Sequence, residues 1–397
     1  MNNKETRYTL SHYLAGALPA RLGDEMSGQA ILLVGIAAGS AALGSTLLAS
    51  LTFAAAVGGP LLGALLDRSK HPGRILGLAI SFYALGLTLI ALSIGHIPTW
   101  LSWILAFATG VFMPAISGGW SSRLKSFIAD EHMTRASAID ATTFNIAGLA
   151  GPALAGVIAA WFGAGWAIAV LIGLLVAALP MAWLLPKHSG RSTIHVTSFL
   201  QDVVAGFKVI IARRALLRIT LTSVISYLGI GMLWVACPLI GREVFGNVGY
   251  GGVLMSVLSA SALAATIAYA KWPTRYSPDT IALLTTVVLA VAMLILAFAD
   301  SRLIVFFAML VAGLADGPQL AAIFAVRHRE APSYSRSQVF TTGASLKITA
   351  AAAGALLAGY LVAESLQVTI LVICLVQLMA ATSFMVLGRH LEFSFWR

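Results

Sequence analysis

Residues 187–216, KHSGRSTIHVTSFLQDVVAGFKVIIARRAL, form the longest polar break in the chain and separate two series of apolar segments. Apolar residues recur within this break at steps of three or four positions, which predicts an amphipathic helix that lies along a membrane surface. We interpret this helix as a cytoplasmic linker between two halves of the protein. Its apolar positions are Val196, Phe199, Val203, Phe207 and Ile210.

Six apolar segments precede this break and six follow it, and a helix needs about 20 such residues to cross a bilayer. The sequence therefore predicts an all-α membrane protein with twelve transmembrane helices. It is divided into an N-terminal half at 1–186, the linker at 187–216 and a C-terminal half at 217–397. The predicted spans cover residues 12–37, 43–66, 75–95, 99–121, 136–162, 165–186, 217–241, 248–270, 280–299, 302–326, 337–363 and 367–388.

The composition also indicates a membrane protein. Hydrophobic residues make up 59% of the chain and charged residues 10%, whereas soluble domains carry about 25% charged residues. The formal net charge of +10 is divided among loops rather than gathered on one face. We therefore expect anionic lipid headgroups, and not nucleic acid, to be its partners.

Basic residues fall in alternate breaks between the predicted spans, and the opposite breaks hold only Arg242 and Arg302. Since Lys and Arg are retained on the cytoplasmic side during insertion, this pattern predicts that both termini and the linker are cytoplasmic. We expect a multi-pass protein of a bacterial-type inner membrane or a plasma membrane.

Several kinds of functional motif are missing from the sequence. Cys237 and Cys374 lie inside apolar spans, and the chain has neither a metal-ligand spacing nor a nucleotide-binding or nucleophile motif. We therefore expect no enzymatic activity, no metal and no cofactor, and an energy source other than ATP. The first apolar run soon meets Arg21, so we expect it to be retained rather than cleaved as a signal peptide.

Two short patterns recur in corresponding spans of the two halves, at offsets close to half the chain length. Parallel six-helix repeats predict such recurrences. The first pattern is Leu-Gly-x-x-Met, and the second is a proline that precedes an arginine by the same separation. They pair Leu22-Gly23-x-x-Met26 with Leu228-Gly229-x-x-Met232, and Pro114 and Arg123 with Pro318 and Arg327.

A glycine and charged residues end the second span, in Gly63-Ala-Leu-Leu-Asp67-Arg68 and then Gly73-Arg74. Gly63 allows two helices to approach closely. The Asp67 carboxylate can accept hydrogen bonds from backbone N–H groups at the start of a facing helix, or pair with Arg123 at the end of the fourth span. We predict a latch that controls opening on the cytoplasmic side. The alternative is a solvated charge that only signals topology.

The fifth span contains Gly148, Gly151, Pro152 and Gly156. The glycines remove side chains from one stretch of helix and the proline removes a hydrogen bond, which permits a kink and tight helix contact. The alternative is ordinary small-residue packing, because Gly and Pro are common in membrane helices.

The number of spans, the two halves and the basic linker resemble those of the major facilitator superfamily of secondary transporters. The sequence from Gly63 to Arg74 is similar to the cytoplasmic loop motif of that superfamily. Ala147-x-x-x-Gly151-Pro152-x-x-Ala155-Gly156 is similar to the motif of its proton-coupled exporters, the twelve-helix drug/proton antiporters. The resemblance implies alternating access to a mid-membrane site.

Ionisable residues inside predicted spans are candidate functional groups, because each opposes insertion by about 2.5 to 3.5 kcal/mol. Arg21 lies three residues before Asp24 and four before Glu25, so it can reach either carboxylate but cannot fully neutralise both. We predict that Glu25 or Asp24 carries a coupling proton and that Arg21 modulates it. The alternative is a static network that joins helices.

The second half contributes two further intramembrane charges, Asp316 and Lys347, which we predict to line a substrate cavity. Other polar, aromatic and methionine residues near the middle of spans could line the same cavity, or could instead pack against helices or lipid. The candidates are Asn145, Met113, Tyr227 and Trp234.

The sequence thus favours a monomeric, proton-coupled antiporter that exports a small amphipathic molecule, with protons, substrate and membrane lipids as its partners. An importer or a flippase for a lipid-like substrate is the first alternative. A membrane receptor or assembly scaffold is the second, because a fold does not dictate function.

Overall fold

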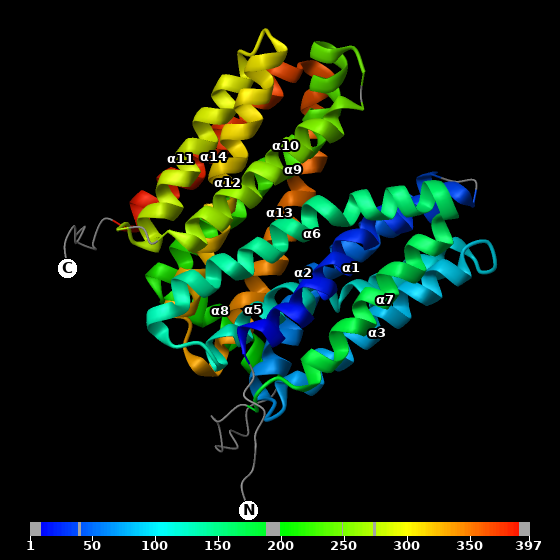
Figure 1. The fold of residues 1–397 in the computed structure, drawn as a ribbon, viewed down its shortest axis with the longest axis vertical. Helices are drawn as coiled ribbons and strands as arrows, with labels where there is room; N and C mark the ends of the chain where they lie inside the picture. Colours follow the sequence, from blue (N-terminus) through cyan, green and yellow to red (C-terminus); the bar gives the residue numbers. More distant parts are fainter. Residues whose placement is uncertain (1–8, 39–40, 188–198, 248, 273–274, 389–397) are drawn as a thin grey trace, which may run out of the picture. The chain divides into compact units, whose positions relative to one another are not determined.

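A computed structural model describes residues 9–38, 41–187, 199–247, 249–272 and 275–388, and their regular structure is entirely helical (Figure 1). The fold class predicted from the sequence is confirmed in its all-α character. The α-helices are α1 (Leu10–Ala37), α2 (Ala41–Arg68), α3 (Pro72–Ser93), α4 (Thr99–Gly110), α5 (Trp120–Arg123), α6 (Met133–Phe162), α7 (Ala164–Trp183), α8 (Phe199–Ala212), α9 (Arg214–Phe245), α10 (Tyr250–Lys271), α11 (Pro278–Ala297), α12 (Arg302–Glu330), α13 (Arg336–Glu364) and α14 (Leu366–Gly388).

Within the described residues, 11 helices are long and apolar enough to cross a membrane, from Leu43–Arg68 to Leu366–Gly388. They correspond to the second through twelfth predicted spans. The first predicted span forms α1, a helix of 28 residues that contains Arg21, Asp24 and Glu25. These three charges lower its mean hydropathy, so its crossing of the membrane remains a prediction.

The fourth span is one membrane segment, Thr99–Ser126, but it is not one continuous α-helix as we expected. α4 ends at Gly110, and a π-helix at Ala115–Gly119 precedes the single turn of α5. Pro114 stands immediately before the π-helix and has no N–H to continue the α-helical hydrogen bonds. Wide turns of this kind occur often at functional sites.

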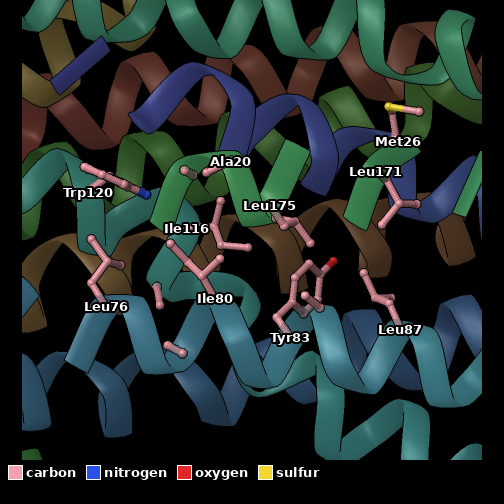
Figure 2. Close-up of a cluster of buried hydrophobic side chains, with 14 of the residues drawn as sticks. Ala20, Met26, Leu76, Ile80, Tyr83, Leu87, Ile116, Trp120, Leu171 and Leu175 are labelled. Carbon is pink, nitrogen blue, oxygen red and sulfur yellow. The ribbon is translucent and has the colours of Figure 1, made fainter. Parts of the chain in front are cut away.

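Two compact units can be distinguished, and α6 and α13 contribute to both. The first unit comprises residues 1–136, 146–206 and 332–345, and we call it unit 1. Its core lies between α1, α3, α7 and the π-helix. Figure 2 shows Leu76, Ile80, Tyr83 and Leu87 projecting from one side of α3, with Leu171 and Leu175 of α7 across from them.

Unit 2 comprises residues 137–145, 207–331 and 346–397. Its core is formed by α9, α10, α11, α12 and α14, with Met232, Cys237 and Met309 among its fully buried side chains. Both native cysteines belong to this unit, and both are buried free thiols.

The helix pairs that pack within unit 1 reappear in unit 2. α1 packs on α7 as α9 packs on α14, and α2 packs on α4 as α10 packs on α12. The recurring Leu-Gly-x-x-Met sequences lie at the first of these pairs. A side chain at Gly23 would meet Leu171 and Leu175 of α7, and one at Gly229 would meet Gln377 of α14. The short sequence recurrence therefore marks equivalent helix contacts.

A helix, α8, lies within the predicted linker. Ile210 is buried and Phe207 is 36% exposed, while Val196 lies outside the described residues. The side-chain amide of Gln338 donates to the carbonyl oxygen of Val203 at 2.7 Å, which joins α8 to the start of α13 within unit 1. The position of α8 at a membrane surface remains a prediction.

Candidate functional site

Arg21 of α1 lies in unit 1 with hydroxyl groups around its guanidinium. The side chain is 2% exposed, and Nη2 donates to Ser121 Oγ at 3.0 Å and to Tyr13 Oη at 3.3 Å. Both acceptors are neutral, so these hydrogen bonds orient the guanidinium without cancelling its charge. The sequence indicated neither partner, because both lie at helix contacts rather than beside another ionisable residue.

Asp24 is held by a tyrosine from another helix. The hydroxyl of Tyr83 on α3 donates to Asp24 Oδ1 at 2.9 Å and lies 3.0 Å from Ser27 Oγ. Ser27 in turn donates to the backbone carbonyl of Asp24 at 2.6 Å. Tyr83 is fully buried, and its ring extends from α3 into the core shown in Figure 2. In the sequence, Tyr83 was marked only by its hydroxyl group within an apolar span, which does not indicate Asp24 as its partner.

Glu25 is exposed, in contrast to the buried Arg21, and it faces the glycine-proline motif of α6. A Cβ atom at Gly151 would lie 2.7 Å from Glu25 Cβ and 3.1 Å from the backbone nitrogen of Met26. Gly148 and Gly156 have nothing within 4 Å of a Cβ atom, and Pro152 is exposed. Of the motif glycines, Gly151 is thus the one that permits close contact with α1.

Asp67 makes both of the contacts that the sequence suggested for it. Its two carboxylate oxygens accept from the backbone N–H groups of Ser337 and Gln338, each at 2.9 Å, at the start of α13. Arg123 Nη2 lies 3.5 Å from Asp67 Oδ1 and also donates to Ser337 Oγ. Asp67 and Arg123 are both buried, so the ion pair is shielded from water within unit 1.

Small residues allow α2 and α13 to approach beside this ion pair. Side chains at Gly59 and Gly63 would collide with Thr341, and the Gly63 position also faces Gln338. Gly59, Gly63 and Asp67 are spaced four residues apart and therefore share one face of α2. We call this face, together with the first turns of α13, the α2–α13 contact.

The remaining residues of the loop motif do not gather around Asp67. Gly73 lies against the backbone of α7, where a side chain would meet the carbonyl oxygen of Ala182. Arg68 and Arg74 are exposed. The structure thus brings Gly63, Asp67 and Arg123 together and places Gly73 in a different helix contact.

Three of the predicted cavity residues lie together in unit 2. The ammonium of Lys347 on α13 stands 3.6 Å from the centre of the Tyr227 ring on α9. The charge of Lys347 also acts on Asp316 of α12. Among the described residues, Asp316 makes neither a hydrogen bond nor an ion pair, and it is partly exposed. Three helices of one unit therefore contribute to a charged cluster.

The other candidates have separate surroundings. Asn145 Nδ2 donates to Thr266 Oγ1 at 2.8 Å and lies 3.4 Å from the carbonyl oxygen of Ala262, which joins α6 to α10 within unit 2. Trp234 is 49% exposed on α9. Met113 packs against the core of unit 1. Their assignment to a cavity remains a prediction.

Comparison with known families identifies a match over most of the chain. The sequence model of a family described as transmembrane secretion effector, a member of the major facilitator superfamily, matches residues 48–393. No curated protein matches the chain.

Solved structures with the same fold include transporters of different substrates. The human organic anion transporter MFSD10 is 14% identical, with a TM-score of 0.74, and the match covers 96% of this chain and 100% of that one. A bacterial homologue of the iron transporter ferroportin is 16% identical with a TM-score of 0.77, at coverages of 96% and 99%. The E. coli fucose:proton symporter FucP is 11% identical with a TM-score of 0.76, at coverages of 95% and 98%.

At these identities the likeness establishes the fold alone, whereas the family match rests on the sequence itself. The chain belongs to the transmembrane secretion effector family of the major facilitator superfamily of membrane transporters.

Proposed function

We propose that this protein is a proton-coupled secondary transporter with twelve membrane-spanning helices that exports a small amphipathic molecule by antiport. The observation that carries the proposal is the set of three ionisable residues, Arg21, Asp24 and Glu25, on the single helix α1. Such residues are costly to insert into a membrane and are kept there mainly for transport or proton transfer.

The surroundings of these residues divide the roles between them. Asp24 is partly buried and accepts from the buried Tyr83, and Arg21 is buried and donates to Ser121. The Glu25 side chain is exposed beside Gly151. An exposed carboxylate can exchange a proton with water more readily than one that a buried tyrosine holds. We therefore favour Glu25 as the group that carries the coupling proton, with Asp24 as the alternative and Arg21 as the charge that modulates both.

The α2–α13 contact is the proposed cytoplasmic latch. Asp67 holds the start of α13 through backbone hydrogen bonds, and a carboxylate is favourable at the positive end of a helix. Release of these bonds would free the first turns of α13 from α2. Alternating access requires such a reversible contact.

The related structures support transport of small molecules but differ in direction and cargo. One is described as an organic anion transporter and another as a fucose:proton symporter. We propose a monomer in an inner or plasma membrane with both termini in the cytoplasm. The family description as a secretion effector supports export over import.

The test uses the purified full chain in inside-out vesicles with an acidic interior and with the membrane potential clamped. Three fluorescent probes share a dansyl group and differ in fixed charge: dansylaminoethyltrimethylammonium, dansylamide and dansyltaurine. Antiport predicts that at least one probe accumulates inside faster with the proton gradient than without it. Glu25→Gln should abolish the effect of the gradient, whereas Glu243→Gln, at an exposed carboxylate of α9, should preserve it.

Each other outcome contradicts a part of the proposal. Movement that is insensitive to the gradient would indicate a flippase, and acceleration by a gradient of opposite direction would indicate symport. If no probe moves, export of amphipathic molecules is wrong. If Glu25→Gln and Asp24→Asn both retain full coupling, the proton is carried elsewhere.

A further inference from the structure

Two buried cations of unit 2 interact with Tyr227. The Lys347 ammonium lies 3.6 Å from the centre of its ring, and the charge of Arg327 is close enough to act on its hydroxyl group. Lys347 is 9% exposed and Arg327 is 1% exposed. One side chain of α9 therefore interacts with positive charges from both α13 and α12.

The guanidinium of Arg327 is incompletely bonded. Neither Nε nor Nη2 has a hydrogen-bond partner among the described residues, although both atoms are buried. No described carboxylate forms an ion pair with this side chain. A buried charged donor without an acceptor is strongly unfavourable, so such groups usually have a ligand or a partner.

Comparison of the two halves identifies the group that Arg327 lacks, which is a carboxylate equivalent to Asp67. Arg123 occupies the position equivalent to Arg327, at the same distance after a proline, and it pairs with Asp67. Arg123 and Arg327 are separated by a fixed number of residues. The same separation, counted from Asp67, leads to Lys271. The second half thus retains the arginine of this pair and has a lysine in place of its carboxylate.

Three acids of unit 2 form no ion pair with Arg327. Asp279 pairs with Arg218 and Arg329, and Glu330 pairs with Arg329. Asp316 acts on Lys347 but forms no ion pair with Arg327. Asp316 therefore acts on one of the two cations, and Arg327 has no ion-pair partner among the described residues.

A hydroxyl group on the same face of α9 adds a further donor. Ser223 lies one helical turn before Tyr227, is fully buried, and its Oγ has no hydrogen-bond partner among the described residues. The surroundings of Tyr227 thus combine a guanidinium, an ammonium and hydroxyl groups. Carboxylate and sulfonate groups accept from all of these, and guanidinium binds such planar or trigonal oxyanions in a defined geometry.

We propose that Tyr227, Arg327 and Lys347 form an anion-binding subsite that takes the carboxylate or sulfonate group of an amphipathic substrate. This inference rests on the proposed transport function and narrows its substrate class to organic anions. Arg327 binds the oxyanion through its two unbonded N–H groups, and Lys347 contributes charge across the Tyr227 ring. The apolar part of the substrate lies outside this subsite.

The test measures equilibrium binding of the three dansyl probes to the full chain in uncharged detergent, where dansyl fluorescence rises on transfer to an apolar site. Dansyltaurine should bind at least about tenfold more tightly than dansylamide, and the quaternary ammonium probe should bind more weakly than either. Lys347→Met and Arg327→Met should each reduce the preference for dansyltaurine about tenfold. Lys347→Arg should preserve it, as should Lys271→Met at an exposed lysine.

Thermal unfolding distinguishes a ligand-binding role of Arg327 from a purely structural one. A structural role predicts that substitution of Arg327 lowers the Tm. Without ligand, Arg327→Met should maintain or raise the Tm, because it removes an unbalanced buried charge. Arg123→Met should lower the Tm, because it leaves Asp67 buried beside no cation. Adding dansyltaurine should raise the Tm of the intact chain and not that of Arg327→Met.

The subsite is wrong if dansyltaurine binds no more tightly than dansylamide, or if the methionine variants leave the preference unchanged. A fall in the Tm of Arg327→Met as large as that of Arg123→Met would also overturn it. Failure of the transport proposal gives a different pattern, with dansyltaurine bound but no effect of a proton gradient. Gradient-driven movement of the cationic probe alone would retain the transport proposal and reject the subsite.

Discussion

Individual buried charges in this protein differ in how they are balanced. Asp67 has a cation and two backbone donors, so its charge is neutralised and solvated by protein groups. Arg327 has neither a carboxylate nor a full set of acceptors among the described residues. Since removing one partner of a buried ion pair leaves an uncompensated charge, we propose a structural and gating role for Asp67 and a ligand-binding role for Arg327.

Asp67→Asn should reduce the free energy of unfolding by about 3 kcal/mol, because it leaves Arg123 as a buried charge without a carboxylate. Chemical unfolding of the purified chain in detergent measures this loss. Asp130→Asn is the matched control, since Asp130 forms an ion pair with Lys125 at 2.9 Å while being 78% exposed. That control should change stability by less than about 1 kcal/mol. Equal effects of the two substitutions would mean that the Asp67 pair contributes little.

At the scale of helices, small residues decide which faces can meet. The glycine positions of α2 admit the first turns of α13, and Gly151 of α6 admits α1 at Glu25. The same motif contains Gly148, which faces no other atom within 4 Å. The glycines of one sequence motif therefore differ in the helix contacts that they make. The contact of each glycine must be known before a role is assigned to it.

Gly151→Ala should destabilise the protein by about 1–3 kcal/mol, because its new methyl group would overlap Glu25 and force α1 to move. Gly148→Ala should instead be neutral or stabilise by up to about 1 kcal/mol, because alanine favours the helix and meets no obstacle. Thermal unfolding of both variants, with gradient-driven probe transport, checks the difference. If Gly148→Ala is the more harmful change, the motif acts by a route other than contact with α1.

At the scale of the whole molecule, the two sequence repeats use the same helix pairs, and α6 and α13 each contribute residues to both units. The first turns of α13 belong to unit 1 while the rest belongs to unit 2. Conversely, residues 137–145 of α6 belong to unit 2, while the part of α6 from residue 146 onward belongs to unit 1. Each of these two helices therefore belongs in part to both units.

The predicted topology can be tested by labelling single cysteines in right-side-out vesicles with a membrane-impermeant maleimide. In a background lacking Cys237 and Cys374, a cysteine at His96 should be labelled and one at Lys70 should be labelled only after the membrane is permeabilised. Both positions are exposed in loops that flank α3. Labelling of Lys70→Cys alone from outside would show that the orientation is inverted.

Much of the fold could be predicted because each membrane span is encoded locally. The span predicted at 217–241 corresponds to α9 at Arg214–Phe245, and that at 302–326 to α12 at Arg302–Glu330. Boundaries differ by a few residues because charged residues such as Arg214 and Glu330 continue the helix beyond its apolar part. The π-helix at Ala115–Gly119 was not predicted, since a proline in a span permits a kink, a break or no change at all.

The candidate site was predicted less completely. Asp67 and Arg123 were found because charges are rare in apolar spans, and Asp316 and Lys347, whose charges act on each other, were found by the same signal. Tyr83, Ser121 and Ser337 were missed as partners, because hydroxyl residues are common in membrane helices and reveal nothing about which helix faces them.

The sequence alone determined the membrane class, 11 of the predicted spans, the internal repeat and the few charges in these segments, because hydropathy and charge act locally along the chain. Tertiary structure alone decided that Tyr83 holds Asp24, that Gly151 and not Gly148 meets α1, and that Arg327 lacks the carboxylate given to Arg123. The physical reason is that hydrogen bonds and close contacts depend on distances between helices, and side chains far apart in sequence set those distances.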